Sequence, residues 1–227
     1  ACFYMEQVEG IKFPSIPGFN INEATDILLK RDFDKYREIG EPHPFLVAKG
    51  RDFLIPFSHE HFELWTQSLH FGAKDRLNFV DPKTNLKVGG GLDDVWLNIN
   101  TNCLHIVDYK STSQKSDKGP ITLDDPWKAS YKRQMDLYVW VLRKKGFHVD
   151  DVGYFLYCDG DRFSDYDFLS STTASMNFKI TLIDYKTNDT WIEPTLQDIS
   201  ECLNESKRPL HSDYCEYGKF LTQSLNQ

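Results

Sequence analysis

The spacing of apolar and polar positions changes character twice along the chain. Residues 22–39 carry apolar side chains at helical intervals with charges between them, and Asn20 or Asn22 can cap the start, so we expect a surface helix whose apolar positions are Ile27, Leu28, Phe33 and Tyr36. From residue 76 the spacing is typical of strands, and from residue 127 it returns to that of a helix, which ends before Gly146. The predicted helices cover 22–39, 59–69, 127–145 and 194–205, and the predicted strands cover 76–80, 86–99, 103–111, 152–157 and 178–184.

This order of elements predicts a mixed α/β fold in which a sheet built from hairpins is flanked by helices. A length of 227 residues suits one domain, with a core over about 20–185 and a C-terminal helix and tail over 190–227. Proline and glycine gather at 10–18 and 40–44, which we interpret as loops.

Composition narrows the function classes. Hydrophobic residues make up 40% of the chain, which excludes a disordered tail or a disulfide-stapled miniprotein. The 34 acidic residues outnumber the 26 basic ones, which argues against a protein that coats nucleic acid but not against an enzyme that grips it in a local basic cleft. No apolar run reaches the ~18–20 residues of a membrane helix, so we expect no membrane association. Five scattered cysteines without a C-x-x-C pair favour reduced thiols and a cytoplasmic location.

An acid and a base follow two apolar residues on one face of the predicted strand 103–111. Alternate side chains of a strand share a face, so Leu104, Ile106, Asp108 and Lys110 point the same way. Burying unpaired charge is costly, and a core-facing row that ends in charge therefore indicates a site rather than packing.

The hairpin register decides which acid lies opposite Asp108. A two-residue loop at 100–101 sets Asp93 opposite Asp108 and pairs apolar residues throughout, whereas a three-residue loop would bring Asp94 there and turn a polar Asn98 toward Leu104. Opposed Cβ atoms lie roughly 4.5–5.5 Å apart, a distance at which two carboxylates need a proton or a cation between them. A hard ion such as Mg²⁺ fits oxygen ligands. Lys110 would then orient an attacking water or neutralise charge on a phosphate.

The predicted helix 127–145 adds a polar group beside aromatic residues. The residues at spacings of four, three and four share one face, and they are Trp127, Tyr131, Gln134 and Tyr138. A buried amide requires a hydrogen-bond partner, so we expect Gln134 to contact substrate, water or a carboxylate, while packing in the core is the simpler role for Trp127 and Tyr131. The same helix carries six basic residues that favour contact with a phosphate backbone, namely Lys128, Lys132, Arg133, Arg143, Lys144 and Lys145.

Three motifs together resemble the RecB-like branch of the PD-(D/E)XK nuclease superfamily. They are Gly91-Leu92-Asp93, Val107-Asp108-Tyr109-Lys110 and Gln134-x-x-x-Tyr138. The resemblance implies an αβββαβ restriction-endonuclease-like core and Mg²⁺- or Mn²⁺-dependent hydrolysis of DNA, single- or double-stranded, by an exonuclease. It also implies protein partners in repair, recombination or defence. Asp93, Asp108 and the carbonyl of Tyr109 would hold the ion, Lys110 would be the catalytic lysine, and Gln134 and Tyr138 the active-site pair on the helix.

The chain departs from this family in two places. Relatives often carry a metal-binding His on the first helix, where the nearest counterpart is Asn22, which suits a helix cap better. Members with an iron–sulfur cluster use four cysteines, but Gly218 stands where Cys215-x-x-Cys would be completed, which argues against a cluster and favours packing roles for Cys2 and Cys215. The alternative function is an inactive nuclease-fold module that binds nucleic acid or a protein partner without cutting.

Overall fold

The structure is a computed structural model that describes residues 1–12, 20–67, 72–114 and 119–225. Its internal contacts divide the chain into two compact units. The larger unit comprises residues 19–81 and 87–189, and the smaller one comprises 1–18, 82–86 and 190–227. The prediction of one domain therefore stays open, although the limits of the larger unit lie near those expected for the core.

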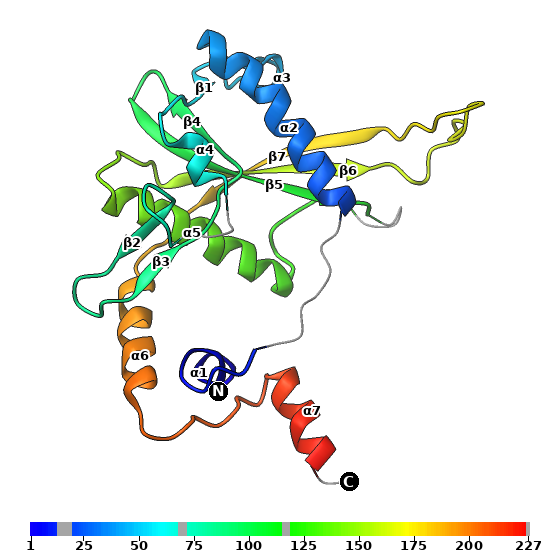
Figure 1. The fold of residues 1–227 in the computed structure, drawn as a ribbon. Coiled ribbons are helices and arrows are strands. Elements are labelled where there is room, and N and C mark those ends of the chain that lie inside the picture. Colours follow the sequence, from blue (N-terminus) through cyan, green and yellow to red (C-terminus); the bar gives the residue numbers. More distant parts are fainter. Residues whose placement is uncertain (13–19, 68–71, 115–118, 226–227) are drawn as a thin grey trace. The chain divides into compact units, whose positions relative to one another are not determined.

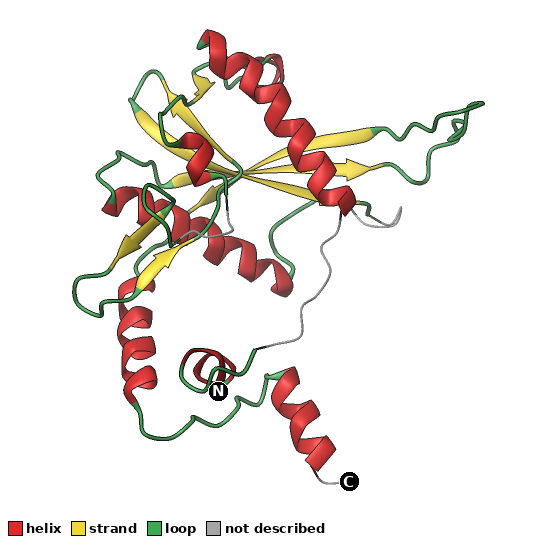
Figure 2. Ribbon diagram, in the orientation of Figure 1, coloured by secondary structure: helices red, strands yellow, loops and turns green. Residues whose placement is uncertain are grey.

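The larger unit is built on a five-stranded mixed sheet with the strand order β1-β4-β5-β6-β7 (Figures 1 and 2). β5 and β6 are parallel and joined through a helix, whereas the other neighbouring strands of this sheet are antiparallel. Its strands are β1 (Leu54–Pro56), β4 (Asp94–Asn98), β5 (Cys103–Thr112), β6 (Val152–Gly160) and β7 (Phe178–Lys186). A second sheet pairs β2 (Asn78–Val80) with β3 (Lys87–Gly89), and the helices are α2 (Asn20–Ile39), α3 (Pro44–Ala48), α4 (Phe62–Trp65), the 3₁₀ turn η1 (Pro126–Lys128) and α5 (Ala129–Lys144).

The sheet lies between α2 on one face and α5 on the other, so that both faces are covered (Figure 1). On the α2 side, Phe33 packs with Trp96 and Tyr109 in a cluster of fully buried residues. On the α5 side, Met135 lies so close to Gly153 of β6 that a Cβ there would be 2.6 Å from its sulfur. The predicted class, a mixed α/β fold with a sheet flanked by helices, is thus confirmed.

The hairpin that joins β4 and β5 has the predicted register. Val95 pairs with Ile106 and Leu97 with Leu104, the fully apolar match. β4 ends at Asn98, one residue before the predicted end, and β5 begins at Cys103 as predicted. The turn between them is closed by Asn102, which adopts a left-handed backbone (φ 56°) and donates its N–H to the Asn98 carbonyl at 2.8 Å. Continuing the register by one step from Asp94 and Val107 brings Asp93 level with Asp108.

The predicted strand 86–99 is wrong, because it is interrupted by a turn at residues 90–93. A Cβ at Gly89 would lie 2.2 Å from the Leu77 carbonyl oxygen, and one at Gly90 would lie 2.8 Å from the ring of Tyr138. These glycines let the chain leave β3 close to its neighbours and re-enter the main sheet as β4. α3 and β1 were not predicted. Within the described residues the helix expected at 59–69 is the single turn α4, while residues 68–69 lie outside them.

The face of α2 that covers the sheet includes only part of its predicted apolar residues. Ile27 and Leu28 are 58% and 50% exposed, whereas Phe33 is buried. Leu29 packs against the same cluster as Phe33, and polar residues also turn inward, with Arg37 largely buried and Asp26 half-buried. α2 also begins at Asn20, which places both candidate cap residues inside its first turn.

The smaller unit contains α1 (Cys2–Gln7), α6 (Ile192–Asn204) and α7 (Glu216–Leu225). Ile192 and Leu196 of α6 are buried, and the buried Tyr4 of α1 donates its hydroxyl to the Glu205 carbonyl at 2.9 Å. α6 agrees with the helix expected from residue 194, but short α1 and α7 carried no signal that we interpreted as helical. Among the described helices, none is long and apolar enough to cross a membrane.

Candidate metal centre of paired carboxylates

Adjacent aspartates at the start of β4 point to opposite sides of the sheet. Asp93 accepts a hydrogen bond from the Tyr109 N–H at 2.7 Å and lies beside Asp108, on the α5 side. Asp94 is fully buried on the α2 side and faces Arg37. Since a strand alternates its side chains, one of the two acids must face each helix. The structure thus selects Asp93, as the register predicted, as the partner of Asp108.

The Asp93 and Asp108 carboxyls interact closely at this position, where Asp108 is buried and Asp93 is half-buried. Burial, together with the negative charge of Asp108, raises the pKa of Asp93 to about 7. Burial likewise raises the pKa of Asp108, and the positive charge of Lys110 counteracts this rise. Two neighbouring carboxylates repel each other, so a proton or a cation between them stabilises this arrangement.

A third carboxyl, that of Asp26 on α2, belongs to the same cluster and was missed by the sequence reading. Burial and the negative charge of Asp93 raise its pKa to about 7, and its Oδ1 has no hydrogen-bond partner. The available signal was its spacing, because Asp26, Phe33 and Arg37 recur at seven and four residues along one helix face. Ile27 and Leu28 are more apolar than Asp26, so they were the residues predicted on the apolar face of the helix.

Lys110 completes the charge cluster. Its Nζ forms an ion pair with the Oδ2 atom of Asp108, and it lies 4.7 Å from the centre of the Tyr131 ring on α5. The predicted common face of Asp108 and Lys110 is therefore confirmed. The lysine side chain is only 16% exposed, so its ammonium is held between the acid and the ring rather than in open solvent.

Gln134 and Tyr138, which lie one turn apart on α5, reach the edge of this cluster. Gln134 donates its Nε2 to the Tyr138 hydroxyl at 2.9 Å, which identifies the partner of the amide as the tyrosine. Burial raises the pKa of Tyr138 to about 12, and the charges of Asp108 and Asp93 add to the effect, which places this hydroxyl near both acids. Trp127 does not belong to the core, because it lies in η1 and is 58% exposed.

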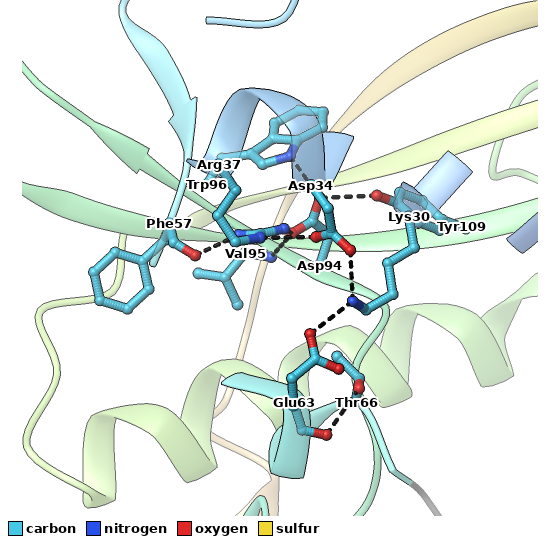
Figure 3. Close-up of polar contacts among 10 residues, drawn as sticks. All are labelled: Lys30, Asp34, Arg37, Phe57, Glu63, Thr66, Asp94, Val95, Trp96 and Tyr109. Carbon is cyan, nitrogen blue, oxygen red and sulfur yellow. Dashed lines mark hydrogen bonds and ion pairs between the residues drawn. The ribbon is translucent and has the colours of Figure 1, made fainter. Parts of the chain in front are cut away.

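The buried Asp94 anchors α2 to the sheet through a network of polar contacts (Figure 3). Its carboxylate pairs with the Arg37 guanidinium at 2.5 Å and accepts bonds from the Tyr109 hydroxyl at 2.8 Å and the Trp96 Nε1 at 3.1 Å. Arg37 also binds Asp34 at 2.9 Å on its own helix. This network fixes the helix that carries Asp26 against the strands that carry the other acids.

The six basic residues near α5 do not form one surface. Lys128 is buried and pairs with Asp125 at 3.1 Å, and Arg143 binds Asp151 and Asp189 at 2.6 and 2.9 Å. Lys128 and Arg143 therefore support the fold, and contact of the other basic residues with phosphate stays a prediction. Lys132, half-buried, and Arg133, exposed, adjoin the turn of α5 that carries Tyr131 and Gln134.

The donor set fits a hard divalent cation. Asp26, Asp93 and Asp108 offer oxygen atoms only, and one buried oxygen of Asp26 lacks a partner. The Tyr109 N–H points to Asp93, and its carbonyl points to the same edge because N–H and C=O of one strand residue face the same way. Mg²⁺ and Mn²⁺ prefer such ligands, so these residues are able to hold one. Asn22 is exposed, and Asp26 is the acid that α2 contributes to this cluster.

The raised pKa of Asp26 predicts a specific pH dependence of stability. The folded chain keeps a proton on this carboxyl up to pH ~7, whereas an unfolded carboxyl releases it near pH ~4, so the contribution to folding is lost as pH rises toward 7. In the presence of a chelator, the free energy of unfolding should fall between pH 5 and 8 by on the order of 2 kcal/mol more in the wild type than in Asp26→Asn. Urea denaturation across this range measures the difference, with Glu38→Gln as an exposed control on α2. Equal pH slopes for wild type and Asp26→Asn would contradict the assignment.

Comparisons with known proteins do not add to this picture. No protein-family model, no curated protein and no solved structure matches the chain. The site is therefore interpreted through its own geometry and chemistry.

Proposed function

We propose that this protein is a Mg²⁺- or Mn²⁺-dependent nuclease that hydrolyses DNA phosphodiester bonds, an exonuclease of the RecB-like PD-(D/E)XK type. The observation that carries the proposal is the convergence of three buried or half-buried carboxyls and one ammonium, from Asp26, Asp93, Asp108 and Lys110. In the main sheet and its two covering helices, the order α2–β1–β4–β5–α5–β6 supports a restriction-endonuclease-like core, since it has the αβββαβ sequence that the motifs imply.

The chain supplies distinct roles for its residues. Asp93, Asp108 and the Tyr109 carbonyl would hold the ion, and Asp26 extends this set. The ion would contribute Lewis acidity at the scissile phosphate. Lys110, held beside Asp108, would position the attacking water and offset the negative charge that develops on the phosphate.

Substrate contacts would come from the adjoining turn of α5. Gln134 and Tyr138 are hydrogen-bonded to each other at the edge of the acidic cluster, where their polar atoms would orient the bond to be cut. Lys132 and Arg133 are the basic residues of this turn, and phosphate contacts from such side chains provide affinity without base specificity.

The test combines ion binding with cleavage. Calorimetry should detect Mn²⁺ binding to the wild type, and Asp108→Asn should weaken it by about a hundredfold, because the substitution removes one of the central anionic ligands. The wild type should cleave end-labelled DNA in Mn²⁺ or Mg²⁺ but not in chelator, and Asp108→Asn should not. Exposed Asp161→Asn, on the loop after β6, serves as the control.

Each contrary outcome has a defined meaning. DNA binding without ion binding or cleavage would favour the inactive module. Turnover of mononucleotides but not of polymers would favour a phosphohydrolase that acts on small nucleotides. Either result would overturn the proposal that the protein is a nuclease.

A further inference from the structure

A second group of ligand-type side chains lies in the smaller unit, far along the chain from the acidic cluster. Cys2 begins α1, and His211 and Cys215 come just before α7. The Sγ atoms of Cys2 and Cys215 are 3.7 Å apart, and His211 Nδ1 is 3.7 Å from the first and 3.3 Å from the second. All three residues are half-buried, so one side of the group reaches solvent. Residues 209 positions apart thus present two sulfurs and a ring nitrogen to one point.

These separations match the edges of a zinc tetrahedron. With Zn–S of about 2.3 Å and Zn–N of about 2.0–2.1 Å, tetrahedral angles place two sulfurs about 3.8 Å apart and a sulfur and a nitrogen about 3.6 Å apart. The observed values lie within a few tenths of an ångström of both. An Sγ–Sγ distance of 3.7 Å is far longer than the ~2.05 Å of a disulfide, and all five cysteines are unbonded.

Gly218 makes the position of the histidine sterically accessible. A Cβ at residue 218 would lie 2.4 Å from the Cβ of His211 and 3.0 Å from its Nδ1, so any larger residue would displace the ring. The Gly218 N–H also donates to the Cys215 sulfur at 3.3 Å, a contact that orients and stabilises a thiolate ligand. The glycine that interrupts the pattern Cys215-x-x-Cys therefore admits an imidazole in place of a third sulfur.

We propose that Cys2, His211 and Cys215 bind a single zinc ion that ties α1 to the segment before α7. Two thiolates and an imidazole are soft and borderline ligands that select zinc over the hard ions suited to the carboxylate cluster. The described residues provide three ligands, and a water molecule or another ligand would complete four-coordination. Because the ion joins residues distant in sequence, its binding would stabilise the smaller unit. This inference is independent of the proposed nuclease function.

The test uses the full chain without a histidine tag, purified anaerobically with a reductant. Elemental analysis should find about one zinc ion per chain, and Co²⁺ added to the stripped protein should give the thiolate charge-transfer band and the visible bands of a tetrahedral site. Cys215→Ser and His211→Ala should each weaken Co²⁺ binding by about a hundredfold or more. Gly218→Ala should weaken it as well, since the added methyl group displaces the histidine.

Two matched variants separate this site from its alternatives. Cys202→Ser removes a half-buried cysteine of α6 outside the group, and Asp108→Asn removes the carboxylate site; both should leave the Co²⁺ spectrum unchanged. Far-UV circular dichroism identifies variants that fail to fold. If a ligand variant fails to fold, Gly218→Ala provides the test in its place, because it retains all three ligands. Four results would overturn the proposal: no metal in the reduced protein, an unchanged spectrum in Cys215→Ser, iron with inorganic sulfide, or a Cys2–Cys215 disulfide under these reducing conditions.

Discussion

Lys110→Ala is expected to lower metal-dependent DNA cleavage by about a hundredfold to a thousandfold while Mn²⁺ affinity stays close to that of the wild type. The ammonium forms an ion pair with Asp108 but is not itself a ligand, so its loss should affect the chemical step rather than ion binding. Single-turnover cleavage of end-labelled DNA, together with calorimetry on the same preparation, measures both quantities. The thermal melt should be nearly unchanged.

This variant separates the role of Lys110 from that of the acids. Asp108→Asn should lose ion binding and cleavage together, whereas Lys110→Ala should lose cleavage alone. Lys186→Ala, which removes an exposed lysine at the end of β7, is the control for a general loss of positive charge. Full activity in Lys110→Ala would refute the catalytic assignment.

The second large effect is expected on stability, from Asp94→Ala. This substitution leaves the Arg37 guanidinium largely buried without its main partner and removes the acceptor for Tyr109 and Trp96. Breaking a buried ion pair in this way costs about 3–5 kcal/mol, which corresponds to a decrease in Tm of roughly 10 °C for a unit of this size. Urea denaturation, with the slope checked for constancy, measures the loss.

The neighbouring acid provides a matched comparison. Asp93→Asn keeps an oxygen that can accept the Tyr109 N–H. It also removes a carboxyl group that is difficult to ionise because it is buried. The free energy of unfolding at pH 8 without metal should therefore equal or exceed that of the wild type. Adding Arg37→Met to Asp94→Ala should recover part of the lost stability, because the unpaired charge is then gone. A similar loss for Asp93→Asn and Asp94→Ala would contradict the division of roles between the two acids.

Local regularities explain why much of the site was predictable. Alternation along β5 placed Asp108 and Lys110 on one face, and a hairpin whose apolar residues must pair with one another allowed one register, which brought Asp93 level with Asp108. The spacing of Gln134 and Tyr138 by one helical turn placed them together, as their hydrogen bond confirms. Each of these relations depends only on residues close in sequence or on one hairpin.

The failures have a common physical origin in contacts between distant segments. Ile27 and Leu28 were predicted to be apolar contact residues together with Phe33, but the ion pair between Arg37 and Asp94 and the packing of Phe33 set a rotation of α2 that leaves them exposed. The predicted strand continued through residues 90–93, but the close approach of Gly90 to Tyr138 and the poor strand propensity of glycine end it there. Propensity contributes little per residue, and tertiary contacts of this strength override it.

The amino-acid sequence by itself determined the class of fold, the register of the β4–β5 hairpin and the pairing of Asp93 with Asp108 and Lys110, because these follow from side-chain periodicity and the cost of burying unpaired charge. Only the tertiary structure decided that Asp26 joins the carboxylates, that Asp94 belongs to the anchor of α2, and that His211 occupies the space beside Gly218 between two cysteines. Those outcomes depend on which distant surfaces pack together, and packing is settled by the whole folded chain.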